Sequence, residues 1–216
     1  MLVAAGRGER FGADRPKAFV KLGGRVLLAE GLERLEGSDW VESIVVVAPP
    51  GWEEPAILVA EELGAGKVAA TVAGGETRMA SVREGVAEVA QDASVVLVHD
   101  AARPLVTDAV IGRVVGALAE GYDGAVPALA LPDTVKRVEA GVVVETLDRA
   151  ELVGAQTPQG FVAAVLRDAL AAGAAAATDC AALVEARGGR VRVVDGDSRL
   201  LKITAPSDLE LVETWL

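Results

Sequence analysis

Runs of apolar residues alternate along this chain with stretches whose apolar residues recur on one helical face. The run at 43–48, Ser-Ile-Val-Val-Val-Ala, and the run at 94–98, Ser-Val-Val-Leu-Val, are typical of parallel strands buried on both sides. Further strands are predicted at 3–5, 67–72, 124–129 and 190–194. Helices are predicted at 25–35, 52–63, 78–89, 107–119, 160–172, 178–186 and 207–215. This alternation predicts an α/β fold with a doubly wound, mostly parallel sheet.

Polar residues mark several of the predicted helix starts. Thr107 and either Thr178 or Asp179 are predicted N-caps. Ser207 lies three residues before Glu210, which is the spacing of a capping box.

The alternation changes between Pro132 and Val153. Two short strands, 134–138 and 142–146, flank Glu139-Ala140-Gly141, which predicts a β-hairpin with the glycine in its turn. A hairpin has no obvious place in a parallel sheet. Two arrangements stay open: a protruding arm that packs on a second subunit, and antiparallel edge strands added to the main sheet.

Composition and charge narrow the class of protein. A chain of 216 residues favours one α/β domain, and no apolar run is long enough to span a membrane. The start lacks a basic segment followed by a long apolar one, and the single Cys180 cannot form an internal disulfide, so we expect a cytoplasmic protein. The net charge of −11 argues against binding DNA or RNA. The net charge does not argue against binding of a small anionic ligand in a local basic pocket.

Glycines alternate with cations in residues 4–17, directly after the first predicted strand. Gly6, Gly8 and Gly12 allow backbone N–H groups to approach an oxyanion, and Arg10 and Lys17 are among the cations that add charge. The spacing fits neither a Walker A loop nor a dinucleotide-binding loop. A phosphate-binding loop and a glycine-rich turn with solvated arginines therefore stay equally open.

Three other side chains could carry chemistry. Asp100 ends a buried strand, where one carboxylate often holds Mg²⁺ beside substrate phosphates. His99, the only histidine, could act as a base, but a structural bond to the backbone is favoured. Lys202 lies in an apolar segment that we expect to be a strand. The favoured interpretation is an edge residue whose side chain extends to reach solvent. Cys180 is expected to be a small buried helix residue, and a zinc site is not expected.

Several short motifs occur together in one order along nearly the whole chain. They are Ala4-Ala5-Gly6 with Gly8 and Arg10, Pro16-Lys17, Gly74-Gly75-Glu76-Thr77-Arg78 with Ser81, His99 to Pro104, Pro132 to Thr134, Asp148-Arg149, Gln156 to Gln159, and Lys202-Ile203-Thr204. Each motif is weak alone, but the ordered set resembles the 2-C-methyl-D-erythritol 4-phosphate cytidylyltransferase family.

The resemblance implies a Rossmann-like fold of the nucleotide-diphospho-sugar transferase type and a transfer of CMP from CTP to a sugar-alcohol phosphate. It implies that Arg10, Lys17 and Lys202 act on the phosphates, and that Asp100 binds Mg²⁺. For CTP binding it implies Ala4, Ala5, Gly6, Gly8, Gly74, Gly75, Arg78 and Ser81. For the acceptor it implies Arg103, Thr134, Arg149 and Thr178. It also implies a homodimer through the arm of residues 132–153, within a single domain of residues 1–216.

The chain departs from the family pattern at a few positions. Val3 replaces a proline, Ala18 a glutamine, and Cys180 and Ala182 an acid and a serine. Enzymes for other polyol phosphates, such as ribitol 5-phosphate, share the same motifs, and a non-catalytic CTP-binding protein is a further alternative. Because Arg10, Lys17, Asp100 and Lys202 are all present, an active enzyme is favoured.

Overall fold

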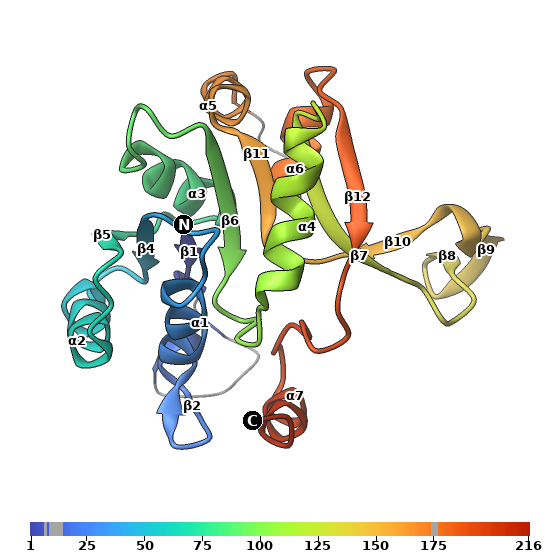
Figure 1. Cartoon of the computed structure of the whole chain (residues 1–216). Coiled ribbons are helices and arrows are strands. Elements are labelled where there is room, and N and C mark those ends of the chain that lie inside the picture. The colour runs from blue at the N-terminus through green and yellow to red at the C-terminus, as the bar shows by residue number, and fades with distance from the viewer. Residues whose placement is uncertain (7, 9–14, 174–176) are drawn as a thin grey trace.

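The computed structural model describes residues 1–6, 8, 15–173 and 177–216. Within this part, a mixed eight-stranded sheet runs in the order β10-β7-β11-β6-β1-β4-β5, with β12 also paired to β7 (Figure 1). Its strands are β1 (Leu2–Val3), β4 (Ile44–Ala48), β5 (Val68–Ala73), β6 (Val95–Asp100), β7 (Gly124–Ala130), β10 (Val153–Ala155), β11 (Gln159–Val162) and β12 (Val191–Asp195). Neighbours are parallel from β6 to β5 and antiparallel around β11 and β10.

Helices cover both faces of the sheet (Figure 1). The helices are α1 (Leu27–Glu36), α2 (Glu53–Leu63), α3 (Arg78–Ala87), α4 (Asp108–Ala119), α5 (Ala163–Ala171), α6 (Cys180–Glu185) and α7 (Pro206–Glu213). Successive side chains of β6 point to opposite faces of the sheet. Leu97 packs on the face covered by α4, while Val96 and Val98 pack on the face covered by α3, α5 and α6. No described helix combines the length and the apolar character needed to cross a membrane.

Most predicted elements are present, with ends shifted by one to three residues. The two apolar runs at 43–48 and 94–98 form β4 and β6, and β6 continues through His99 to Asp100. Thr107 occupies the N-cap position of α4 without a side-chain cap bond, whereas Asp179 caps α6 by accepting from the Ala182 N–H at 3.0 Å. The antiparallel pairs of the main sheet are formed by β10 and β11, which lie in the second half of the chain.

Four predictions of local structure are wrong. Residues 160–162 form strand β11 and not the start of a helix, because they fill the position between β6 and β7. Arg25–Val26 form the short strand β3, which pairs with β2 (Lys21–Leu22) and delays α1. The segment around Lys202 is not a strand; its Ile203 N–H bonds the Ala102 carbonyl at 2.8 Å.

The fourth error concerns the start of α7, where the predicted capping box at Ser207 is absent. Ala205 is the N-cap, and the Asp208 carboxylate accepts from the N–H groups of Thr204 and Ala205 at 2.7 and 2.8 Å. Pro206 at the first helical position fixes this earlier start, because its missing N–H needs no partner there.

The hairpin stands away from the main sheet as an arm (Figure 1). Its strands β8 (Lys136–Glu139) and β9 (Val142–Thr146) pair only with each other in the described structure. Ala140 and Gly141 have φ values of 46° and 82°, as a tight hairpin turn requires. The alternative in which these strands join the main sheet is therefore wrong.

Candidate active site

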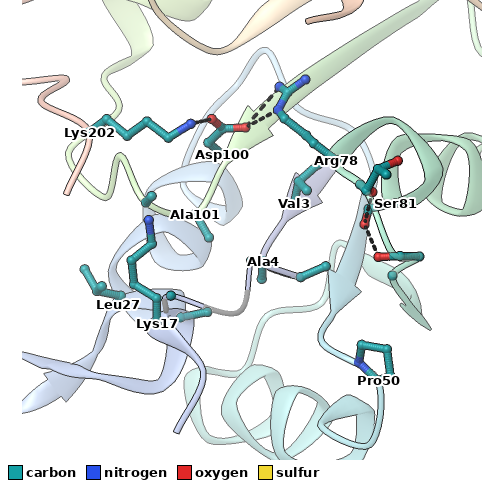
Figure 2. Close-up of a pocket in the computed structure, with 18 of the residues that line it drawn as sticks. Val3, Ala4, Lys17, Leu27, Pro50, Arg78, Ser81, Asp100, Ala101 and Lys202 are labelled. Carbon is teal, nitrogen blue, oxygen red and sulfur yellow. Dashed lines mark hydrogen bonds and ion pairs between the residues drawn. The ribbon is translucent and has the colours of Figure 1, made fainter. Parts of the chain in front are cut away.

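A cavity of about 740 Å³ opens at the carboxyl ends of the parallel strands β1 and β6, beside the loops after β4 and β5. This is where ligands bind on open α/β sheets. The structure places eleven of the predicted site residues on its wall: Ala4, Ala5, Gly6, Gly8, Lys17, Gly74, Gly75, Arg78, Ser81, Asp100 and Lys202. Segments from both ends of the chain therefore meet in one cavity (Figure 2).

The other predicted residues that the structure describes do not line this cavity. Arg10 lies outside the described residues. Arg103 donates to the Leu200 carbonyl at 2.6 Å, so its guanidinium joins two backbone segments. Thr134 and Arg149 are exposed within the arm of residues 132–153, where Arg149 donates to the Pro132 carbonyl, and Thr178 is exposed before α6. Within the described part of one chain, the four acceptor-binding candidates therefore lie outside the lining of the cavity that holds Lys17, Asp100 and Lys202.

Asp100 is the electrostatic centre of the cavity. Its Oδ1 accepts from Arg78 Nε and Nη2 at 3.1 and 3.0 Å, and its Oδ2 accepts from Lys202 Nζ at 2.7 Å. Figure 2 shows the two cations reaching the carboxylate from opposite sides. Burial alone raises the pKa of Asp100, but the charges of Arg78 and Lys202 outweigh it and lower the pKa to about 2. The carboxylate is therefore ionised at neutral pH.

Lys17 adds a third cation to the same wall. It begins the short 3₁₀ helix η2 (Lys17–Phe19), and its Nζ donates to the Ile203 carbonyl at 2.8 Å. Ile203 directly follows Lys202 in the chain, so this bond places the Lys17 ammonium group beside the segment that carries Lys202. The described lining holds three cations, Lys17, Arg78 and Lys202, against two carboxylates, those of Asp100 and Glu76. This excess of positive charge favours binding of an anion.

The loop between β5 and α3 forms the opposite side of the cavity. A Cβ atom at Gly74 would lie 2.3 Å from the Ala5 Cβ, so this glycine lets the loop pack against the first glycine-rich segment. Ser81 is buried, and its hydroxyl lies 3.0 Å from the Thr77 carbonyl oxygen. Glycine at position 74 is therefore required by the close approach of two loops that both line the site.

His99 has a structural role, as the sequence favoured. Its Nε2 lies 3.0 Å from the Arg103 carbonyl oxygen, which can only accept, so Nε2 carries the proton. Nδ1 then accepts from the Thr157 hydroxyl at 3.0 Å, and the Thr157 oxygen accepts from the Asp100 N–H at 3.1 Å. This chain of bonds fixes the backbone of Asp100. Burial lowers the pKa of His99 to about 4.

We expect the folded protein to keep His99 neutral well below the usual histidine pKa of about 6.5. Between that pH and about 4 the unfolded chain binds a proton that the folded chain does not, so the free energy of unfolding falls as pH decreases. The loss amounts to roughly 3 kcal/mol across this window. Because the chain has one histidine, proton NMR of its imidazole reports the titration directly.

A titration midpoint near 6.5 in the folded protein would contradict this assignment. The His99→Gln variant is the control, because its unfolding free energy lacks the histidine contribution to the pH dependence between 6.5 and 4.

Sequence reasoning missed two groups of residues. Thr157 supports Asp100 from a distant part of the chain, and no local pattern around it predicts that contact. The cavity wall also includes Val3, Ala18, Leu27, Pro50, Glu76, Thr77, Ala101, Ala102 and Thr204. Several of these residues, such as Glu76, Thr77 and Thr204, lie inside the recognised motifs, and that position could have predicted them as part of the cavity wall. Cys180 is fully buried at the start of α6, as expected for a structural residue.

Comparison with known proteins identifies the family. Residues 1–216 match the family model described as IspD: 2-C-methyl-D-erythritol 4-phosphate cytidylyltransferase. The chain is 48% identical over 217 residues to the enzyme of that name from Nocardia farcinica, covering 100% of this chain and 92% of the relative. It is 46% identical to the bifunctional enzyme IspD/IspF of Clavibacter michiganensis, of whose length it spans 53%.

The fold agrees with this match. The crystal structure of 2-C-methyl-D-erythritol 4-phosphate cytidylyltransferase from Thermus thermophilus superposes with a TM-score of 0.81 at 35% identity, covering 100% of this chain and 97% of that one. The ordered motifs, the strand arrangement and the full-length match lead to one conclusion. This chain belongs to the 2-C-methyl-D-erythritol 4-phosphate cytidylyltransferase family.

Proposed function

We propose that this chain transfers CMP from CTP to 2-C-methyl-D-erythritol 4-phosphate, giving 4-diphosphocytidyl-2-C-methyl-D-erythritol and pyrophosphate on the non-mevalonate route to isoprenoids. The observation that carries the proposal is the meeting of Lys17, Asp100 and Lys202 in one cavity at the sheet's carboxyl edge. The full-length family match supports the methylerythritol acceptor. The single buried Cys180 fits a reducing compartment, and we place the reaction in the cytoplasm.

The chain's own residues align and neutralise the reacting phosphates. The acceptor's phosphate oxygen is already anionic, so attack on the α-phosphate of CTP needs no general base. The new P–O bond forms as the bond to pyrophosphate breaks, and negative charge accumulates on the phosphoryl oxygens and on the leaving group. Lys17 and Lys202 supply positive charge where this negative charge accumulates, and we propose the same role for Arg10. Gly8 and Gly75 line the cavity, and without Cβ atoms they would let the nucleotide approach the backbone closely.

The proposed cofactor is a divalent cation, with Mg²⁺ as the specific choice. In the described part of the chain, no group of three or more His, Cys, Asp or Glu side chains could hold a metal alone. Mg²⁺ is commonly bound by one or two carboxylates together with substrate phosphates, and the ionised Asp100 on the cavity wall fits that use. Bound there, the ion would neutralise charge on the phosphates. Lys202, which contacts Oδ2, would have to give up that contact.

Kinetics with two acceptors test the proposed reaction. Pyrophosphate release is measured with CTP, Mg²⁺ and either methylerythritol phosphate or ribitol 5-phosphate at equal concentration. We expect a higher kcat/KM for methylerythritol phosphate. A higher value for ribitol phosphate would overturn the acceptor assignment, and tight CTP binding without any pyrophosphate release would favour a non-catalytic binding protein.

We further propose that two chains form a dimer through the arm of residues 132–153. A two-stranded hairpin is marginally stable alone, yet this arm exposes valines on both faces. Val138 and Val143 pair across the strands, and Val142 lies on the opposite face of β9 from Val143. Val144 is the extra residue where the register shifts, and it is exposed as well. A second copy would cover these valines, and it could receive the exposed Thr134 and Arg149 at its acceptor site.

A charge placed on the arm is expected to weaken the dimer. Val144 is 50% exposed, and Val144→Glu puts a carboxylate on the surface proposed to be covered. Sedimentation velocity should show a shift toward the monomer, and KM for the acceptor should rise by roughly tenfold, the cost of about 1.4 kcal/mol of lost binding, while KM for CTP stays the same. The control is Leu58→Glu on α2, where the side chain is 52% exposed. An unchanged sedimentation coefficient in Val144→Glu would contradict the proposed interface.

A further inference from the structure

The two oxygens of Asp100 have different partners. Oδ1 accepts two bonds from a single guanidinium, from Nε and Nη2 of Arg78. Oδ2 accepts one bond, from the ammonium group of Lys202. A guanidinium presents its donors in a fixed planar arrangement, whereas an ammonium on a four-carbon stem rotates freely. The contact on Oδ1 is therefore the more directional of the two.

Arg78 is also held more firmly than Lys202. It is the first residue of α3, whose N-cap Thr77 accepts from the Ala80 N–H at 3.0 Å. Its side chain is 25% exposed, against 40% for Lys202. Lys202 lies in a segment that forms neither helix nor strand. The main chain of Asp100 is fixed as well, by its bond to Thr157. Of the two contacts to Asp100, the one between Oδ2 and Lys202 therefore breaks at the lower cost in free energy.

We propose that Arg78 is a positioning residue that holds Oδ1 of Asp100, so that Oδ2 is the oxygen that exchanges Lys202 for the cation arriving with the nucleotide. The inference rests on the proposed function, because it assumes a cation-dependent nucleotide site. It replaces the expectation that Arg78 contacts CTP directly. Lys202 leaves Oδ2 in the same exchange and becomes available to the phosphates.

The test separates binding of the metal from binding of the nucleotide. In Arg78→Met, Mn²⁺ binding to the enzyme with CTP is measured by electron paramagnetic resonance, and CTP binding in EDTA is measured by calorimetry. Because a residue that orients a metal ligand typically contributes 10–100-fold to metal affinity, we expect the Mn²⁺ Kd to rise by roughly tenfold or more. CTP binding in EDTA should stay within about twofold, a difference of roughly 0.4 kcal/mol.

Two further variants make the test specific. Arg83→Met removes an exposed arginine from the same helix, and it should leave both affinities unchanged. Arg78→Lys keeps the charge without the paired donors and should give an intermediate Mn²⁺ Kd; it decides the question if Arg78→Met does not fold. In the Asp100→Asn background, Arg78→Met should cause no additional loss of Mn²⁺ binding, because its effect passes through the carboxylate.

Weaker CTP binding in EDTA with an unchanged Mn²⁺ Kd would overturn the inference and assign Arg78 to the nucleotide. An additional loss of Mn²⁺ binding in the double variant would also overturn it. Failure of the proposed function looks different: the wild-type protein would release no pyrophosphate with methylerythritol phosphate, while the Arg78 dependence of Mn²⁺ binding could still hold.

Discussion

Lys17→Ala is expected to lower kcat by roughly two orders of magnitude, with a smaller change in KM. The reason is the position of the ammonium group on the cavity wall, beside the segment that carries Lys202. In phosphoryl transfer, charge grows on the phosphoryl oxygens and on the leaving group as the reaction proceeds, so a cation that contacts them stabilises the transition state more than the bound substrates. Steady-state kinetics with varied CTP and with varied acceptor measure the two parameters separately.

Lys21→Ala is the matched control for Lys17→Ala. Lys21 lies in β2, four residues along the chain, and its side chain is exposed away from the cavity wall. We expect its kinetics to equal those of the wild type. If Lys17→Ala changed KM alone and left kcat intact, Lys17 would bind substrate without stabilising the transition state, and its proposed role would be wrong.

Asp100→Asn is expected to lower kcat/KM by roughly 100-fold or more and to weaken Mn²⁺ binding. The asparagine keeps the shape of the side chain but removes the negative charge that Arg78 and Lys202 neutralise. It also places an amide N–H₂ where one oxygen accepted from a cation, and a donor cannot face a donor. Pyrophosphate release over a range of Mg²⁺ concentrations measures the loss, and high Mg²⁺ should restore only part of the activity.

The control is Asp92→Asn, which removes a charge from an exposed loop before β6. Its Mg²⁺ dependence should match that of the wild type. Wild-type Mg²⁺ dependence in Asp100→Asn itself would show that the carboxylate is not a metal ligand in this enzyme. The Asp100→Asn protein should also lose less stability than the wild type as the pH falls from about 4 to about 2, since the wild-type carboxylate takes up its proton in that range.

The predictions that succeeded rest on long, regular patterns. β4 and the first four residues of β6 are continuous apolar runs, and α4 repeats its apolar residues at helical spacing over twelve residues. The errors concern short segments whose local sequence fits more than one structure. Gly160-Phe161-Val162 could extend the following helix, and only the open position between β6 and β7 makes it a strand.

Sequence alone determined most of the order of strands and helices, without β2, β3, β10 and β11, and it also determined the hairpin and the set of charged residues whose motifs resemble the family. These follow from local periodicity, turn chemistry and motif spacing, which are properties of neighbouring residues. Tertiary structure alone decided that the Lys202 ammonium group contacts Asp100, that Arg78 holds the other oxygen of Asp100, and that Thr157 supports its backbone. Those contacts join residues far apart in the chain, and their energies exist only once the sheet has brought the segments together.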